Sequence, residues 1–148
     1  MKSDTNYMNR QKMSLISGKA TNYDSVLFLA CNDIRETLYT LNAIEIDARA
    51  IDYDPKFEDY DLYECKDFVF DDVNLDAELV VHMNCEKTFP FDRTGDVILI
   101  GDDERHNGDC VPILSCNQLT YMYDVKEVYE EHVIEYHGKH YYIVWGRM

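Results

Sequence analysis

Residues 25–30 read Ser-Val-Leu-Phe-Leu-Ala, and this stretch decides the fold class. It is an almost wholly apolar run of strand length, which is typical of a parallel strand buried on both faces. Two later segments, 79–83 and 97–100, have the same character, and residues 48–52 are a fourth candidate. We therefore predict a mostly parallel sheet with residues 26–30 and these three segments as its central strands.

The segment between the first two predicted strands has helical periodicity. Ile34 and Leu38 lie at helical spacing, so residues 33–43 are predicted as an amphipathic helix. Asp33 is its expected N-cap, with Glu36 three residues later as in a capping box. A strand, a helix and a second strand followed by an acid-rich turn form the opening unit of a doubly wound sheet.

The end of the chain differs from this pattern. Residues 125–131 are a short helical candidate, and segments 132–136 and 140–145 flank the hairpin signal Gly138-Lys139. Several connections between the predicted strands are too short to hold a full helix. The predicted fold is therefore α/β and Rossmann-like, with a mostly parallel sheet closed at one edge by a C-terminal antiparallel hairpin.

Length and charge restrict the function. The chain has 148 residues with 14 Lys and Arg against 29 Asp and Glu, so its net charge is 14 − 29 = −15. A chain of this length with 46% hydrophobic residues is expected to form one folded domain. The strong negative charge argues against direct binding of duplex nucleic acid through its phosphates, and it disfavours docking on anionic membranes.

The N-terminal residues carry the opposite sign. Residues 1–22 contain Lys2, Arg10, Lys12 and Lys19 with a single acid. We predict a basic, partly ordered arm over 1–22, which either folds back on the acidic body or remains a free tail. Residues 23–148 are predicted as the single domain.

Cysteine usage indicates a reducing compartment. The chain has five cysteines, an odd number, and no CxxC pair. The first 20 residues show no signal-peptide core, and the longest apolar run is too short to span a bilayer. We therefore expect a cytoplasmic protein that does not enter membranes.

Metal binding is not expected. His106, Cys110 and Cys116 fit no common zinc spacing. The acids around Asp102 and Asp109 lack the spacing of an EF-hand, so a solvated acidic loop is the preferred interpretation.

Three segments resemble a known family. Residues 79–86 resemble the fourth strand and following turn of small class I S-adenosylmethionine-dependent methyltransferase-like proteins of tailed bacteriophages, residues 95–100 their fifth strand, and residues 136–147 their last hairpin. The resemblance covers about residues 24–148. It implies a trimmed class I methyltransferase-like fold with S-adenosylmethionine as cofactor, bound at the carboxyl edge of the strands.

The resemblance assigns cofactor contacts to the turn Ala30-Cys31-Asn32. In the family this turn is rich in glycine, which lets the backbone approach the ligand, whereas here it contains none. Asn32 can replace one glycine because asparagine tolerates positive φ. The turn therefore predicts weak or absent cofactor binding, and a plain strand-to-helix turn is the alternative.

Two further positions match cofactor-binding places of the family. Asp52, with Asp54 as the near alternative, matches the acid that accepts hydrogen bonds from the ribose hydroxyls. Asp67 and Phe68 match the pair that contacts adenine. The alternatives are a solvated acid for Asp52, and a surface turn followed by a core phenylalanine for the pair.

The turn Asn84-Cys85-Glu86 lies where the family holds the methyl acceptor. Asn84 would orient a nitrogen or oxygen nucleophile, and Glu86 would take its proton. Cys85 as a thiolate would need a positive neighbourhood, for which Lys87 is the one nearby cation in the sequence. A purely structural turn is the alternative.

Two functions follow from these patterns. The first is a degenerate methyltransferase-like protein that binds an adenosyl ligand weakly or acts through its surface. The second is a non-catalytic acidic protein, an inhibitor or nucleic-acid mimic, that binds a basic surface of a host protein. Its support is the segment 52–78, where two bases and eleven acids give 2 − 11 = −9.

Overall fold

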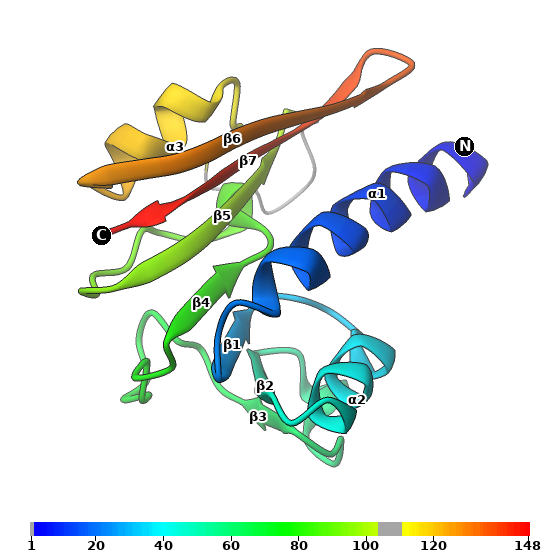
Figure 1. Ribbon diagram of the computed structural model, residues 1–148, viewed down its shortest axis with the longest axis vertical. Coiled ribbons are helices and arrows are strands. Elements are labelled where there is room, and N and C mark those ends of the chain that lie inside the picture. Colours follow the sequence, from blue (N-terminus) through cyan, green and yellow to red (C-terminus); the bar gives the residue numbers. More distant parts are fainter. Residues whose placement is uncertain (1, 104–110) are drawn as a thin grey trace.

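The computed structural model describes residues 2–103 and 111–148, with side chains from residue 7 onward, and contains one seven-stranded sheet. The strand order is β3-β2-β1-β4-β5-β7-β6 (Figure 1). The strands are β1 Ser25–Leu29, β2 Asp47–Asp52, β3 Tyr63–Cys65, β4 Leu79–His82, β5 Asp96–Asp102, β6 Glu127–Tyr136 and β7 Lys139–Arg147.

The first five strands are parallel, and the last two form an antiparallel hairpin. β1 pairs with β2 and β4, β2 with β3, and β4 with β5, all in parallel, whereas β7 pairs antiparallel with β5 and β6. His137 and Gly138 connect the hairpin with φ of 53° and 78°, as a tight turn between twisted strands requires. The predicted mostly parallel sheet with a C-terminal hairpin is confirmed.

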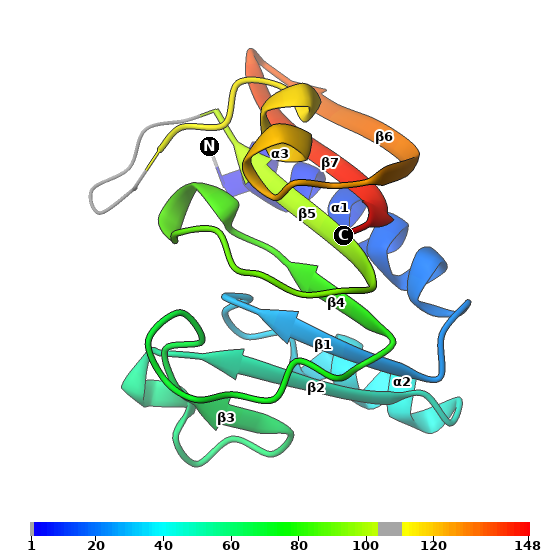
Figure 2. The same ribbon diagram turned by 90° about the vertical axis from the view of Figure 1, so that its left-hand side faces the viewer.

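Helices cover both faces of the sheet (Figure 2). α1 Lys2–Ala20 and α2 Arg35–Ala43 pack on one face, and α3 Cys116–Met122 packs on the other. Leu38 and Leu41 of α2 bury against the first face, while Leu119 of α3 buries against the second. β1, β4 and β5 are buried on both faces, which explains their continuous apolar sequences.

Several connections are shortened, as predicted. The 3₁₀ turn η1 Pro55–Phe57 lies between β2 and β3, and η2 Cys85–Lys87 follows β4. No helix occurs in residues 66–78. Within the described residues no helix is long and apolar enough to cross a membrane.

The N-terminal segment differs from the sequence prediction. Instead of a partly ordered arm, the structure has a continuous helix over Lys2–Ala20. Met8, Ile16 and Ala20 of this helix are at most 1% exposed, because they lie on one helix face against the sheet. The Lys19 ammonium contacts the Glu130 carboxylate at 2.6 Å, so the basic segment does fold back on the acidic body.

Two helix predictions are corrected. Residues 125–131 are not a helix, because β6 begins at Glu127 and pairs with β7 along its length. The helix lies earlier, at Cys116–Met122, where the Ser115 hydroxyl accepts the Gln118 N–H at 3.0 Å as an N-cap.

The predicted helix at 33–43 begins two residues later, at Arg35. Asp33 is not its N-cap, since its carboxylate binds the Arg35 guanidinium at 2.8 Å and the Arg35 N–H at 3.2 Å. The N–H of Ile34 instead donates to the Tyr63 hydroxyl at 2.8 Å, which ties the helix start to β3.

Candidate functional site

The carboxyl ends of β1, β2 and β4 meet at one edge of the sheet. Ladder bonds continue past the strand ends, from Ala30 N–H to the Ile51 carbonyl and from Met83 N–H to the Leu29 carbonyl, both at 3.1 Å. The predicted site residues 30–32, 52 and 83–86 are therefore brought together.

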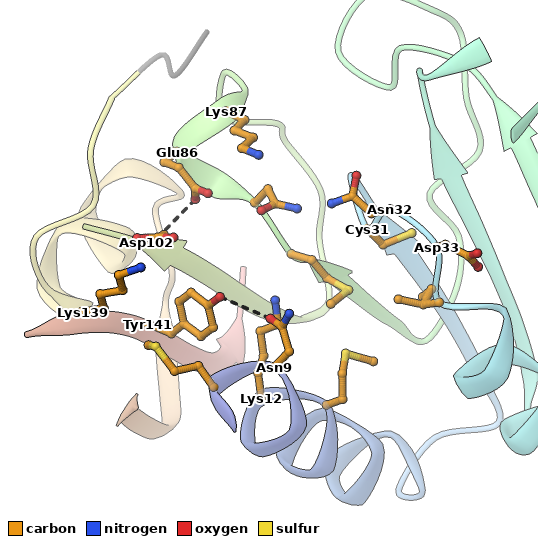
Figure 3. A pocket seen from close by; sticks show the side chains of 15 residues that line it. Asn9, Lys12, Cys31, Asn32, Asp33, Glu86, Lys87, Asp102, Lys139 and Tyr141 are labelled. Atoms are coloured by element: carbon orange, nitrogen blue, oxygen red, sulfur yellow. Dashed lines mark hydrogen bonds between the residues drawn. The ribbon is translucent and has the colours of Figure 1, made fainter. Parts of the chain in front are cut away.

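A cavity of about 420 Å³ opens between α1, the turn after β1, η2 and the hairpin (Figure 3). Polar and charged groups from five segments distant in sequence share its wall. They are Asn9, Lys12, Asn32, Asp33, Asn84, Glu86, Lys87, Asp102, Lys139 and Tyr141.

A second cavity of about 160 Å³ lies beside β2. Asp52 and Asp67 line it together with aromatic rings that are unusually exposed, since Tyr53, Phe70 and Phe89 have 69%, 76% and 57% of their surface accessible. Large exposed aromatic residues around one hollow are typical of a ligand site. These rings were missed in the sequence, where the only signal was their position beside the predicted acids.

A third hollow of about 80 Å³ lies next to both cavities. It shares Ala30 and Asp52 with the smaller cavity, and Asn32 and Asn84 with the larger one. The three hollows therefore follow one another along the carboxyl ends of β1, β2 and β4.

The turn after β1 has two residues in the left-handed backbone conformation that glycine usually adopts, although it contains no glycine. Ala30 and Asn32 both take positive φ, of 50° and 56°. The prediction for Asn32 is confirmed, and Ala30 is an additional, less tolerant case. Asn84 donates its side-chain amide to the Ala30 carbonyl and closes the gap between β1 and β4.

Cys31 points away from solvent. Only 4% of the residue is exposed, and burial raises the pKa of its thiol. It belongs to the core on this face of the sheet and also lines the larger cavity.

Asp52 is buried, and its two oxygens support the turns around it. Oδ2 accepts the Asn32 N–H at 2.9 Å, and Oδ1 accepts the Asp54 N–H at 3.1 Å. Each carboxylate oxygen has a second lone pair, so Asp52 retains acceptor capacity toward a ligand. Asp54 turns to η1, where it accepts the Lys56 N–H at 3.0 Å.

Asp67 and Phe68, predicted as a pair, have different surroundings. The Asp67 carboxylate accepts the Val69 N–H at 3.0 Å at the rim of the smaller cavity. Phe68 is only 8% exposed and packs edge-to-face on His82 and Phe91, with ring centroids 5.2 and 5.9 Å away. Its packing is that of a core residue beneath the cavity.

The turn after β4 sends its side chains in two directions. Asn84 and Glu86 line the larger cavity. Cys85 is fully buried in the core on the other side of the sheet, and burial raises the pKa of its thiol. The structure therefore gives Cys85 the environment of a core residue, not that of a reactive thiolate.

Glu86 is the most perturbed acid of the site. It is 2% exposed, and burial, with a smaller contribution from the Asp102 charge, raises the pKa of its carboxyl to about 7. Oε2 accepts the Asp102 N–H at 3.3 Å. A carboxyl with a pKa near neutrality suits a group that exchanges protons with a substrate.

His82 holds the turn from below. It is fully buried, its Nε2 lies 2.6 Å from the Thr88 hydroxyl, and its Nδ1 accepts the Asn84 N–H at 3.3 Å. Burial lowers the pKa of the imidazole to about 3, so it is neutral. Its hydrogen bonds position Asn84 at the cavity.

Lys12 enters the site from α1, which the sequence alone did not indicate. Its ammonium lies 4.8 Å from the centre of the Tyr141 ring, and Tyr141 donates its hydroxyl to Asn9 at 3.2 Å (Figure 3). Burial lowers the pKa of Lys12, while the charges of Glu86 and Asp102 act in the opposite direction.

Within residues 2–103 and 111–148 no group of three metal-ligating side chains occurs. His106, Cys110 and Asp109, which the sequence singled out, lie outside the described residues.

Comparison with known proteins identifies no matching family model and no matching curated protein. Solved structures do match. Magnesium protoporphyrin IX methyltransferase (ChlM) from Synechocystis PCC 6803, with bound S-adenosylmethionine, aligns with a TM-score of 0.71 and 7% identity over 98% of this chain and 82% of that one. The N-methyltransferase NodS from Bradyrhizobium japonicum WM9 aligns with a TM-score of 0.67 and 10% identity over 97% and 98%.

The S-adenosylmethionine-dependent methyltransferase SibL, in its apo form, aligns with a TM-score of 0.61 and 10% identity over 93% of this chain and 55% of that one. At such identities the likeness shows the fold alone. The chain has the Rossmann-like fold of the class I S-adenosylmethionine-dependent methyltransferases.

Proposed function

We propose that this chain binds S-adenosylmethionine, with the adenosine in the smaller cavity and the methionine half in the third hollow, between Ala30, Asn32 and Asn84, so that the methyl group faces the larger cavity. One observation carries the proposal: Asp52 and Asp67 lie beside the exposed rings of Tyr53, Phe70 and Phe89 at the carboxyl edge of the sheet. Carboxylates accept from ribose hydroxyls and from an exocyclic amine, and exposed rings stack on a base. The fold of the solved neighbours supports the same ligand.

The residues present fit the adenosine half better than the methionine half. Asp52 keeps unused lone pairs toward the ribose, and Asp67 lies at the rim for the base. In the turn, the Cβ atoms of Ala30 and Asn32 narrow the approach that glycines would leave open, and Asn84 bridges to the Ala30 carbonyl. We therefore expect weak binding, as in a degenerate methyltransferase-like protein.

S-adenosylmethionine, when bound, would supply a methyl group carried on a sulfonium. Of the residues predicted at the methyl acceptor, Asn84 would orient a nucleophile, and Glu86 would hold or accept its proton; both line the larger cavity. Residual transfer to nitrogen or oxygen would depend on these two side chains, and Cys85 would take no part in it.

Calorimetric titration with S-adenosylmethionine and S-adenosylhomocysteine tests the proposal. We expect a dissociation constant on the order of 0.1–1 mM. Asp52→Ala should weaken binding by about tenfold, since it removes hydrogen bonds to the ribose. Tyr53→Ala should weaken it by a similar factor through lost stacking.

The matched control is Tyr39→Ala, which removes another exposed tyrosine, 49% accessible, that lines neither cavity. It should leave the affinity unchanged. Absence of any binding heat at millimolar ligand would refute the proposal, as would equal losses for Tyr39→Ala and Tyr53→Ala.

The acidic segment 52–78 supports a second candidate, binding of a basic surface on a host protein. Asp59, Asp61 and Glu64 are exposed, and β3, which contains Glu64, is the edge strand of the sheet. Such a face accelerates association with a positively charged partner. A phage origin stays a prediction from the sequence, since the matching structures named above do not address it.

A further inference from the structure

We propose that the larger cavity binds a small molecule that carries both a carboxylate and an amine, with Lys12 as the counter-ion of the carboxylate and Glu86 as the partner of the amine. This proposal rests on the proposed function in one respect, since the amine of the ligand would be the methyl acceptor.

The cavity has opposite charges on different elements. Lys12 projects from α1 beside Tyr141 of β7, whereas Glu86 and Asp102 project from η2 and the end of β5 (Figure 3). At about 420 Å³ the space lies within the range of small-molecule sites. A ligand that spans it meets Lys12 on the helix side, and on the sheet side the carboxylates of Glu86 and Asp102 with Lys87 and Lys139 beside them.

Lys12 is the group that points to an anion. Its ammonium is partly buried and lies over the Tyr141 ring, and no oxygen of the described part of the chain lies at hydrogen-bond distance from it. An ammonium has three donors, and withdrawing them from water without acceptors is unfavourable. A bound carboxylate would satisfy these donors.

Glu86 is the group that points to an amine. Its buried carboxylate has one described hydrogen bond, from the Asp102 N–H at 3.3 Å, which leaves acceptor positions toward the cavity. An ammonium ligand would donate to it and compensate its burial. The lining as a whole carries both signs, with Lys12, Lys87 and Lys139 against Asp33, Glu86 and Asp102, which suits a ligand that itself carries both charges.

The wall between these groups is apolar and adaptable. Met8, Met13 and Met83 line the cavity. Methionine side chains are flexible and accommodate varied hydrocarbon shapes. The carbon skeleton of the ligand would lie against them, so the site would select the two charged groups more strictly than the skeleton.

These methionines also provide a site-specific measurement. In protein with ¹³C-labelled methionine methyl groups, each of the twenty standard amino acids is added singly, with and without saturating S-adenosylhomocysteine. We expect at least one amino acid to shift the signals of Met8, Met13 and Met83, but not those of Met122 and Met148, which do not line this cavity. The amine that lacks only the carboxylate of that amino acid should bind at least tenfold more weakly than the amino acid.

Variants of α1 test the role of Lys12. Lys12→Gln should weaken binding of the amino acid at least tenfold, so that the amino acid and its decarboxylated amine bind equally. Lys12→Arg, which keeps the positive charge, should bind the amino acid more tightly than Lys12→Gln does. Arg10→Gln removes the same charge from an exposed position on the same helix and should have no effect. Thermal unfolding of each variant verifies that α1 remains folded.

The outcomes separate the two proposals. If S-adenosylhomocysteine binds and no amino acid shifts the three signals, the ligand class proposed here is wrong while the cofactor site stands. If amino acids bind but S-adenosylhomocysteine does not, the cofactor proposal fails and the cavity assignment stands. An equal effect of Lys12→Gln and Arg10→Gln would contradict the role of Lys12.

Discussion

Individual residues in the turn after β1 decide how close a ligand can come to the backbone. Ala30 with φ 50° has a steric cost that glycine would not have, because its Cβ is crowded in the left-handed region. Asn32 with φ 56° tolerates the same region more easily. The turn therefore keeps a glycine-type conformation, and under the proposed function we expect its side chains to hinder the cofactor.

Ala30→Gly should raise the free energy of unfolding by about 0.5–1 kcal/mol, because it relieves the left-handed strain. Combined with Asn32→Gly it should also increase the affinity for S-adenosylmethionine, which calorimetry measures. Ala43→Gly at the end of α2 is the control, since it replaces an alanine in a helix and should destabilise the protein. Loss of stability in Ala30→Gly, or unchanged affinity in the double variant, would contradict the obstruction.

Glu86 makes stability depend on pH. Its pKa is raised to about 7 in the folded protein from 4.5, so the folded state binds more protons than the unfolded state between these values. Stability should therefore fall as pH rises from about 4.5 to about 7, and Glu86→Gln should remove this contribution, with a gain of roughly 2–3 kcal/mol at pH 8. Urea unfolding at pH 5 and pH 8 gives the change in the free energy of unfolding for the wild type and for Glu86→Gln. An equal change in both proteins would show that Glu86 is not responsible.

At the scale of elements, the hairpin and the N-terminal helix complete the site that the parallel strands begin. β7 contributes Lys139 and Tyr141 to the larger cavity, and α1 contributes Lys12. The two strands of the hairpin approach closely at Gly146, whose Cα faces the Glu127 carbonyl next to the irregularity between Val128 and Glu130. Glycine at position 146 permits this contact.

Gly146→Ala should lower the free energy of unfolding by about 1–3 kcal/mol, since the added methyl group would lie 2.3 Å from the Glu127 carbonyl oxygen. Gly18→Ala is the matched control, because its Cβ would meet nothing within 4 Å and alanine favours the helix. It should raise stability by about 0.5–1 kcal/mol. Chemical denaturation measures the free energy of unfolding of both variants. If Gly146→Ala changes it by a similar amount and in the same direction as Gly18→Ala, the close contact is contradicted.

At the scale of the whole molecule, the net charge of −15 is spread unevenly, with −9 in residues 52–78. This segment contains the acids of the smaller cavity and the exposed acids beside β3. One stretch of chain therefore has two expected uses, cofactor contacts at Asp52 and Asp67 and attraction of a basic partner by the exposed acids between these two residues.

The triple variant Asp59→Lys, Asp61→Lys and Glu64→Lys tests the second use. A basic host protein recovered on the immobilised chain should associate with this variant at least tenfold more slowly at low salt, and with a flatter salt dependence. Glu36→Lys, Asp47→Lys and Glu131→Lys change the charge equally at exposed positions outside the segment and should have a smaller effect. Equal rates for wild type and the first variant would show that the acidic face serves solubility only.

The sequence by itself determined the central strands, the hairpin and the order of the site segments. These features are local, because a continuous apolar run such as 25–30 or 97–100 is explained by burial on both faces wherever it lies. The positions of Asp52, Asn84 and Glu86 followed, since the carboxyl ends of parallel strands share one edge. Positive φ at Asn32 was likewise foreseeable from the residue type.

Only the tertiary structure decided which of these side chains reach a cavity. Cys85 and Glu86 are neighbours, yet one enters the core and the other the site, because η2 turns between them. Residues 127–131 became strand because β7 was available to pair. Lys12, in a segment with no strict periodicity, reached Tyr141 only by packing of α1 across the sheet, a contact between residues more than a hundred positions apart that no local pattern encodes.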